Sequence, residues 1–118
     1  MRRTFRAASN YALSLIVLGR FEEAKSLLRK TMPVARRVLG ENDDLTLRMR
    51  WHSAQSLYMD DDATLEDLRE AVNTLEETER TARRVLGGAH PLTVDIERDL
   101  QAQRAALDAQ ETPPPETS

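Results

Sequence analysis

The sequence contains no cysteine, and only five of its 118 residues are aromatic. The lack of cysteine excludes disulfides, thiolate catalysis and zinc sites built on cysteine. It also fits a reducing compartment, and we therefore expect a cytoplasmic protein. Because aromatic residues are scarce, the hydrophobic core must consist mainly of leucine, valine, alanine and methionine.

Long apolar runs are also missing, since no segment approaches the roughly 20 apolar residues that a membrane span requires. Residues 1–21 contain arginine and serine but no acidic residue, a composition that is found in targeting leaders as well as in ordinary helices. No small-x-small cleavage pattern follows the apolar stretch 11–19. We therefore favour the first core helix over a leader for this segment.

The net charge of −3 hides an uneven distribution. Residues 1–40 hold nine basic and two acidic residues, whereas the remainder holds eight basic and eighteen acidic residues. Such asymmetry can steer partners and lets neighbouring molecules attract each other, so a homo-oligomer is one of our expectations. A nucleic-acid partner is not expected, because the isoelectric point is about 5.4 and no aromatic residues alternate with the basic ones.

One short stretch occurs twice in the chain. "RRVLGENDDLTL" at 36–47 and "RRVLGGAHPLTV" at 83–94 share seven of twelve residues, at an offset of 47. Further upstream, "NYALSL" at 10–15 matches "HSAQSL" at 52–57 at an offset of 42. The difference predicts that the second copy carries five extra residues, between Tyr58 and Leu65.

Both copies show apolar residues at helical spacings, and strand-like alternation is absent. Gly40 and Gly87 follow the last apolar pair of their helices, where a left-handed conformation is needed. Pro33 lies inside the second helix and is expected to kink it. The predicted helices are 4–18, 21–39, 44–58, 63–86 and 91–110.

These helices form two hairpins and a final single helix, joined by short connections. One hairpin cannot cover its own apolar face, so the next hairpin must stack on it. We therefore predict an all-α, right-handed α-solenoid of antiparallel hairpins at 1–110. Because the array is short, either the fifth helix acts as a polar cap, or the chain self-associates, or it is a fragment of a longer array. Residues 111–118, rich in proline, are expected to form a disordered tail.

The residues at the turns resemble a known family. Ala12, Gly19, Phe21 and Ala24 occupy the positions of the small residue, turn glycine, aromatic and helix-B alanine of tetratricopeptide repeats. The joint "LGGAHPLT" at 86–93 resembles the "LGxxHPxT" pattern of the kinesin-light-chain variety. The resemblance implies about 2.5 repeats and a module that binds a protein or peptide, with neither catalysis nor a cofactor.

In this family the first helix of each hairpin lines a concave groove. There an asparagine can bond a peptide backbone, an arginine can bind a carboxylate through two parallel bonds, and a tryptophan can serve as an anchor. Trp51 could equally be a packing residue. By family register, the candidate groove residues are Arg6, Ser9, Asn10, Leu13, Arg48, Trp51, His52, Gln55, Asp95, Arg98 and Asp99.

Other chemistry finds little support in the sequence. His52 has no partner at a useful spacing for a triad or zinc site, and His90 precedes Pro91 in a joint, where a structural role is expected. The aspartates at 60–62 fit an N-cap better than a calcium loop, which needs further oxygen ligands. The alternative to a peptide-binding module is an oligomerising or terminal segment of a larger scaffold, without a ligand of its own.

Overall fold

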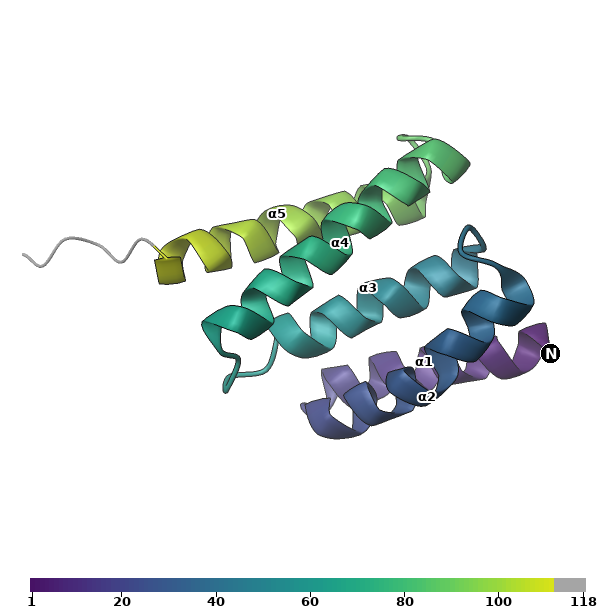
Figure 1. The fold of residues 1–118 in the computed structure, drawn as a ribbon, viewed down its shortest axis with the longest axis horizontal. Coiled ribbons are helices and arrows are strands. Elements are labelled where there is room, and N and C mark those ends of the chain that lie inside the picture. Colours follow the sequence, from purple (N-terminus) through teal and green to yellow (C-terminus); the bar gives the residue numbers. More distant parts are fainter. Residues whose placement is uncertain (112–118) are drawn as a thin grey trace, which may run out of the picture.

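The computed structural model describes residues 1–111, and in this range the regular structure consists of helices alone (Figure 1). Their bounds agree with the sequence-based prediction to within two residues. Residue 111 belongs to the last helix, although we expected it in the tail, and the predicted tail from 112 to 118 lies outside the described residues. The helices are α1 (Arg2–Val17), α2 (Phe21–Leu39), α3 (Asp44–Tyr58), α4 (Leu65–Leu86) and α5 (Pro91–Glu111).

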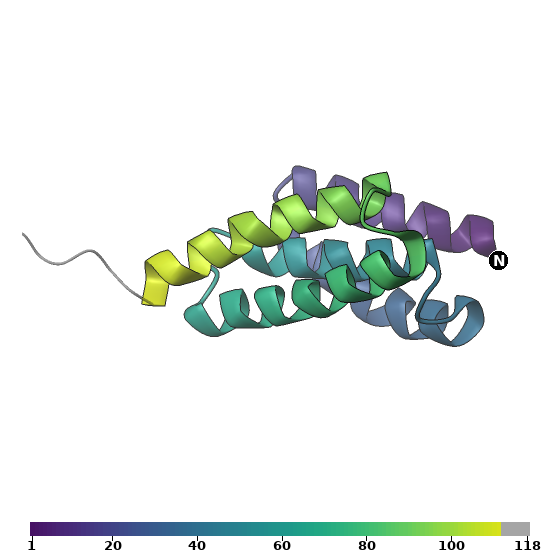
Figure 2. The same cartoon turned by 90° about the horizontal axis from the view of Figure 1, so that it is seen from above.

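The helices form two stacked hairpins, α1–α2 and α3–α4, followed by α5 (Figure 1). α3 packs against all four other helices, and α5 also packs against α4, whereas α2 and α4 do not touch each other. Figure 2 shows α1 and α5 along one side of the molecule, α2 and α4 along the other, and α3 between them. This arrangement confirms the predicted helical-repeat solenoid.

Glycine ends both second helices of the hairpins, as predicted. Gly40 has φ 94° and ψ 160°, and Gly87 has φ 93° and ψ 154°, a backbone region that essentially only glycine adopts. Their amides donate to the carbonyl oxygens of Arg36 and Arg83, at 3.0 and 3.1 Å. A pair of arginines occupies the last turn of α2 and of α4, where the helix dipole stabilises positive charge.

Replacing Gly40 with alanine is expected to lower the free energy of unfolding by about 1–3 kcal/mol. An added Cβ would meet no atom within 4 Å, so the cost comes from the backbone conformation alone. Gly88→Ala is the control, because its Cβ would meet only the flexible end of Arg83. Chemical denaturation of the two variants measures the difference, and equal stabilities would contradict this reading of the joint.

Two hydrophobic clusters share α3. Phe5, Leu28 and Met49 belong to the cluster between α1, α2 and α3, and Leu75 and Ile96 belong to the cluster between α3, α4 and α5. Alanines at equivalent positions of the two hairpins have no exposed surface, which lets the helix backbones approach closely. These are Ala12 and Ala54, Ala24 and Ala71, and Ala35 and Ala82.

Pro33 does not break its helix, because α2 continues through it from Phe21 to Leu39.

α1 buries Phe5, Leu15 and Ile16 and therefore packs as the first core helix. In the described part of the chain, no helix combines the length and the apolar character that crossing a membrane requires.

Candidate functional site

One stripe of side chains on each of α1, α3 and α5 forms a common surface, which we call the α1–α3–α5 face. On α1 the stripe follows positions 6, 10, 13 and 17, whose spacing of four, three and four residues keeps them on one side of a helix. The face continues with positions 48, 51 and 55 on α3, with Met59 just after the end of that helix, and with positions 95, 98 and 102 on α5. The stripes on α1 and α3 meet in one hollow, and Trp51 of α3 donates a hydrogen bond to Asp99 of α5.

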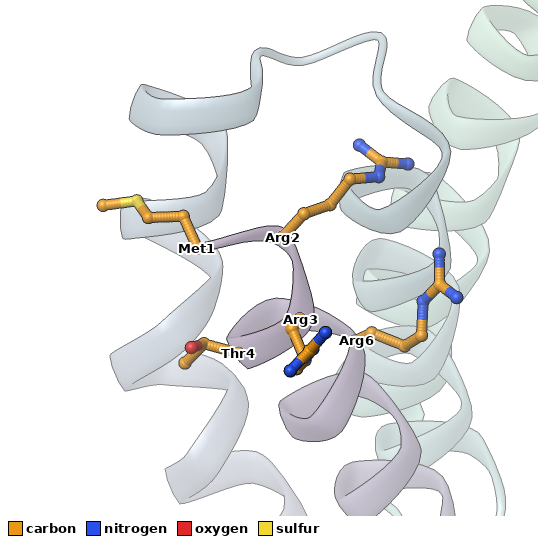
Figure 3. Close-up of a pocket in the computed structure, with 5 residues that line it drawn as sticks. All are labelled: Met1, Arg2, Arg3, Thr4 and Arg6. Carbon is orange, nitrogen blue, oxygen red and sulfur yellow. The ribbon is translucent and has the colours of Figure 1, made fainter.

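The first part of this face is a hollow of about 320 Å³ between α1 and α3, lined by Arg6, Ser9, Asn10, Asp44, Leu45 and Arg48. Among the described residues Arg6 makes no ion pair, and Arg48 Nε lies 3.8 Å from Asp44 Oδ2, too far for a hydrogen bond. Figure 3 shows the side chains of Arg2 and Arg6 extending from the first turns of α1. Arg2 is bound to Asp43 and Asp44, so Arg6 and Arg48 are the guanidinium groups available to a ligand.

The stripes on α1 and α3 are apolar toward the C-terminal ends of these helices. Leu13, Val17 and Met59 are 37%, 75% and 44% exposed. The three residues lie toward the C-terminal ends of α1 and α3, while the arginines lie toward the N-terminal ends. The α1–α3–α5 face therefore changes from basic to apolar along its helices.

Trp51 joins α3 to α5. Its half-buried ring packs on the cluster between α3, α4 and α5, and its indole N–H donates to Asp99 Oδ2 at 2.7 Å. Gln103, which is fully buried, also donates to Asp99 Oδ2, at 3.3 Å. Of the two roles that the sequence left open for Trp51, the structure therefore supports packing, and the carboxylate of Asp99 is already engaged. Gln103 was not among the predicted site residues, and only its spacing of four from Asp99 hinted at the contact.

Two of the predicted groove residues are almost fully buried. Ser9 is 2% exposed, although it is part of the lining of the hollow between α1 and α3. His52 is 5% exposed and is not part of that lining, so the expectation that His52 faces an open groove is wrong. α3 is covered on both flanks by other helices, whereas α1 has a free edge, so Asn10 is exposed although it is equivalent to His52. His52 stacks on Trp51 with ring centroids 5.6 Å apart, and its Nδ1 lies 2.8 Å from Gln55 Oε1.

The remaining candidates lie on α5. Asp95 and Arg98 are both exposed, and Arg98 Nη1 lies 3.8 Å from Asp95 Oδ1. The hollow between α1 and α3 does not include them. The structure therefore brings together Arg6, Asn10 and Arg48 and leaves the α5 pair as a separate part of the face.

Lowering the pH is expected to destabilise the fold through His52. Burial lowers the pKa of His52, the nearby Arg48 lowers it further, and the hydrogen bond with Gln55 opposes them. Because the folded pKa lies below the unfolded value of about 6.5, the stability contribution is complete above that pH and is lost as the pH falls through it. Urea unfolding at about pH 7.5 and about pH 5.5 should show a larger loss for the wild type than for His52→Gln. Equal losses in the two proteins would contradict this role of His52.

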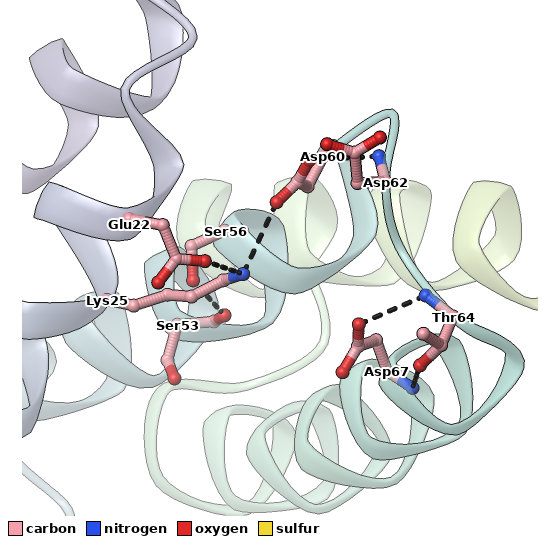
Figure 4. A network of polar contacts seen from close by, with 8 residues as sticks. All are labelled: Glu22, Lys25, Ser53, Ser56, Asp60, Asp62, Thr64 and Asp67. Carbon is pink, nitrogen blue, oxygen red and sulfur yellow. Dashed lines mark hydrogen bonds and ion pairs between the residues drawn. The ribbon is translucent and has the colours of Figure 1, made fainter.

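The aspartate run lies in the turn between α3 and α4 (Figure 4). We had expected this run to be the N-cap of α4, and that prediction is wrong. Thr64 caps the helix and forms a capping box with Asp67. Asp60 instead accepts the amide N–H of Asp62 at 3.0 Å and lies 3.4 Å from Lys25 Nζ. The inserted residues thus connect the second hairpin to the first.

Other polar residues also have structural roles. His90 Nδ1 accepts the amide N–H of Leu92 at 3.1 Å, at the start of α5. Within residues 1–111, no group of three or more histidine or acidic side chains is placed to hold a metal ion.

Residues 4–44 match the family model described as a tetratricopeptide repeat. The matched segment covers nearly all of α1, all of α2 and the joint to α3, which is one complete hairpin unit. Comparisons with curated proteins and with solved structures gave no match. Residues 4–44 are therefore similar to one tetratricopeptide repeat, and the second hairpin stacks on this unit. Such repeats are a non-catalytic fold that generally mediates protein–protein interaction.

Proposed function

We propose that this chain is a non-catalytic, kinesin-light-chain-like interaction module of the cytoplasm. It binds a peptide segment that carries acidic residues next to apolar ones, on the α1–α3–α5 face. The observation that carries the proposal is the hollow of about 320 Å³ in which Arg6, Asn10 and Arg48 meet.

The chemistry of the face defines the ligand. A guanidinium group binds a carboxylate through two parallel hydrogen bonds, and an asparagine amide both donates to and accepts from a peptide backbone. The exposed apolar residues Leu13, Val17 and Met59 continue the same stripes. The stripe on α1 spans about 16 Å, which corresponds to about five residues of an extended peptide.

A selection from a displayed library of random peptides tests this ligand class. The chain is immobilised at neutral pH, and the enriched peptides should combine aspartate or glutamate with leucine, isoleucine, phenylalanine or methionine. Enrichment of basic peptides would overturn the proposal.

Arg48→Ala is expected to weaken binding of a selected acidic peptide about 10- to 100-fold, because a hydrogen bond to a charged group contributes about 1.5–3 kcal/mol. Arg6→Ala should have a similar effect. Arg80→Ala is the matched control, since Arg80 is an exposed arginine on α4, outside the α1–α3–α5 face. Fluorescence anisotropy with the labelled peptide measures the affinities. Unchanged affinity in both groove variants would refute the groove assignment.

A further inference from the structure

The two ends of the stacked hairpins carry opposite charges. The basic end consists of residues 1–6 and 34–44, with five arginines and three acidic residues, of which Asp43 and Asp44 bind Arg2. The acidic end consists of residues 19–25 and 59–70, with eight carboxylates and three basic side chains. The basic end contains the start of α1 and the end of α2, and the acidic end contains the α1–α2 and α3–α4 turns.

These two ends lie far apart in one molecule. Figure 1 shows the start of α1 and the α2–α3 connection at one end of the hairpins, with the α1–α2 and α3–α4 turns at the other. The antiparallel course of the helices requires this placement. The opposite charges therefore cannot satisfy each other within one chain.

Several charges at both ends have no counterpart. Arg3 and Arg37 make no ion pair among the described residues, and neither do Asp61, Asp62 and Glu70. The basic side chains of the acidic end are already bound to neighbouring carboxylates. Arg20 binds Glu23, Lys25 binds Glu22 and Asp60, and Arg69 binds Glu111.

The acidic end also contains a groove. α2 and α4 do not touch, and the space between them forms two hollows of about 450 and 420 Å³ that share Glu22, Lys25 and Asp67. The lining of the larger hollow includes Leu28, Met32 and Leu57. A partner that combines an apolar side chain with free positive charge complements this surface.

The basic end offers that combination. Met1 is 76% exposed, and the close-up in Figure 3 shows it at the start of α1, with its side chain pointing away from that of Arg2. We propose that the basic end of one copy docks in the groove between α2 and α4 of a second copy. Because two different surfaces meet, each added copy presents a new acidic groove or basic end, so the assembly grows in a head-to-tail manner.

Sedimentation velocity of the intact chain over a range of concentrations tests the proposal. The average mass should rise with concentration at about 0.1 M salt and fall back toward that of the monomer at about 1 M, where the Debye length shrinks from about 10 to about 3 Å. A monomer at all concentrations in low salt would overturn the proposal, and so would association that salt leaves unchanged.

Charge reversals at the two ends give a sharper test. Arg3→Glu/Arg37→Glu reverses two of the unpaired charges of the basic end, and Asp61→Lys/Asp62→Lys reverses two of those of the acidic end. Each double variant alone should associate at least about 10-fold more weakly than the wild type. A mixture of the two variants should recover association, because one variant keeps an intact acidic groove and the other an intact basic end.

Arg80→Glu/Arg98→Glu changes the net charge by the same amount as the basic-end variant, at positions outside both ends, and should associate like the wild type. A closed dimer that survives both end variants, or a mixture without a complex, would overturn the proposal. Arg48→Ala separates this proposal from peptide binding, because Arg48 lies outside both ends: the change should weaken peptide binding about 10- to 100-fold and leave self-association within about twofold.

Discussion

Replacing Arg50 with methionine is expected to raise the free energy of unfolding by about 1–3 kcal/mol. The reason is that a poorly paired buried ion loses more hydration free energy than it gains from attraction to its partners. Arg50 is 4% exposed, and its Nε is buried without a hydrogen-bond partner among the described residues. Its nearest carboxylate oxygens, on Glu41 and Glu77, both lie 3.7 Å away.

The pKa of Arg50 is lowered, first by burial and then by the neighbouring Arg36, while Glu77 and Glu41 oppose the shift. Methionine fills a similar volume with flexible apolar atoms and carries no charge. Glu77→Gln is the informative counterpart, since it removes a partner and keeps the buried cation, and it should lower stability. Guanidinium chloride unfolding measures both variants. A loss of stability in Arg50→Met would show that its ion pairs outweigh the cost of burial.

Replacing Leu75 with alanine is expected to lower the free energy of unfolding by about 2–5 kcal/mol, through lost apolar burial and the cavity that remains. Leu75 is fully buried in the cluster between α3, α4 and α5, and it occupies the position on α4 that Leu28 holds on α2. Small domains are stable by only about 5–15 kcal/mol, so this single change removes a large share of the total.

Val85→Ala is the matched control for Leu75→Ala, because Val85 lies on the same helix and is 39% exposed. It should change stability by less than about 0.5 kcal/mol. Thermal unfolding followed by circular dichroism compares the two variants with the wild type. A small loss for Leu75→Ala would mean that the second hairpin does not depend on this cluster.

The sequence predicted the helices well because the signals that begin and end them are local. Apolar spacing, Gly40 and Gly87 at the helix ends and the shift in offset between the copies are all readable from neighbouring residues. The prediction was wrong about the N-cap of α4, because the helix begins after the three aspartates. Thr64 caps it and forms a capping box with Asp67.

The candidate site was harder to predict, because exposure depends on which helix lies beside a side chain. Asn10 and His52 occupy equivalent positions, yet only Asn10 is exposed, since α1 has a neighbour on one flank and α3 on both. The hydrogen bond between Trp51 and Asp99 joins residues 48 positions apart, and no local sequence pattern predicts it.

The order, length and ends of the helices, and the repetition of one hairpin, were determined by the sequence itself, because each depends on residues a few positions apart. The tertiary structure alone decided which polar side chains stay accessible to a partner. It buried Ser9 and His52, engaged Asp99 and left Arg6 and Arg48 open beside a common hollow. The physical reason is that accessibility is set by contacts between helices, which the spacing along any one helix does not encode.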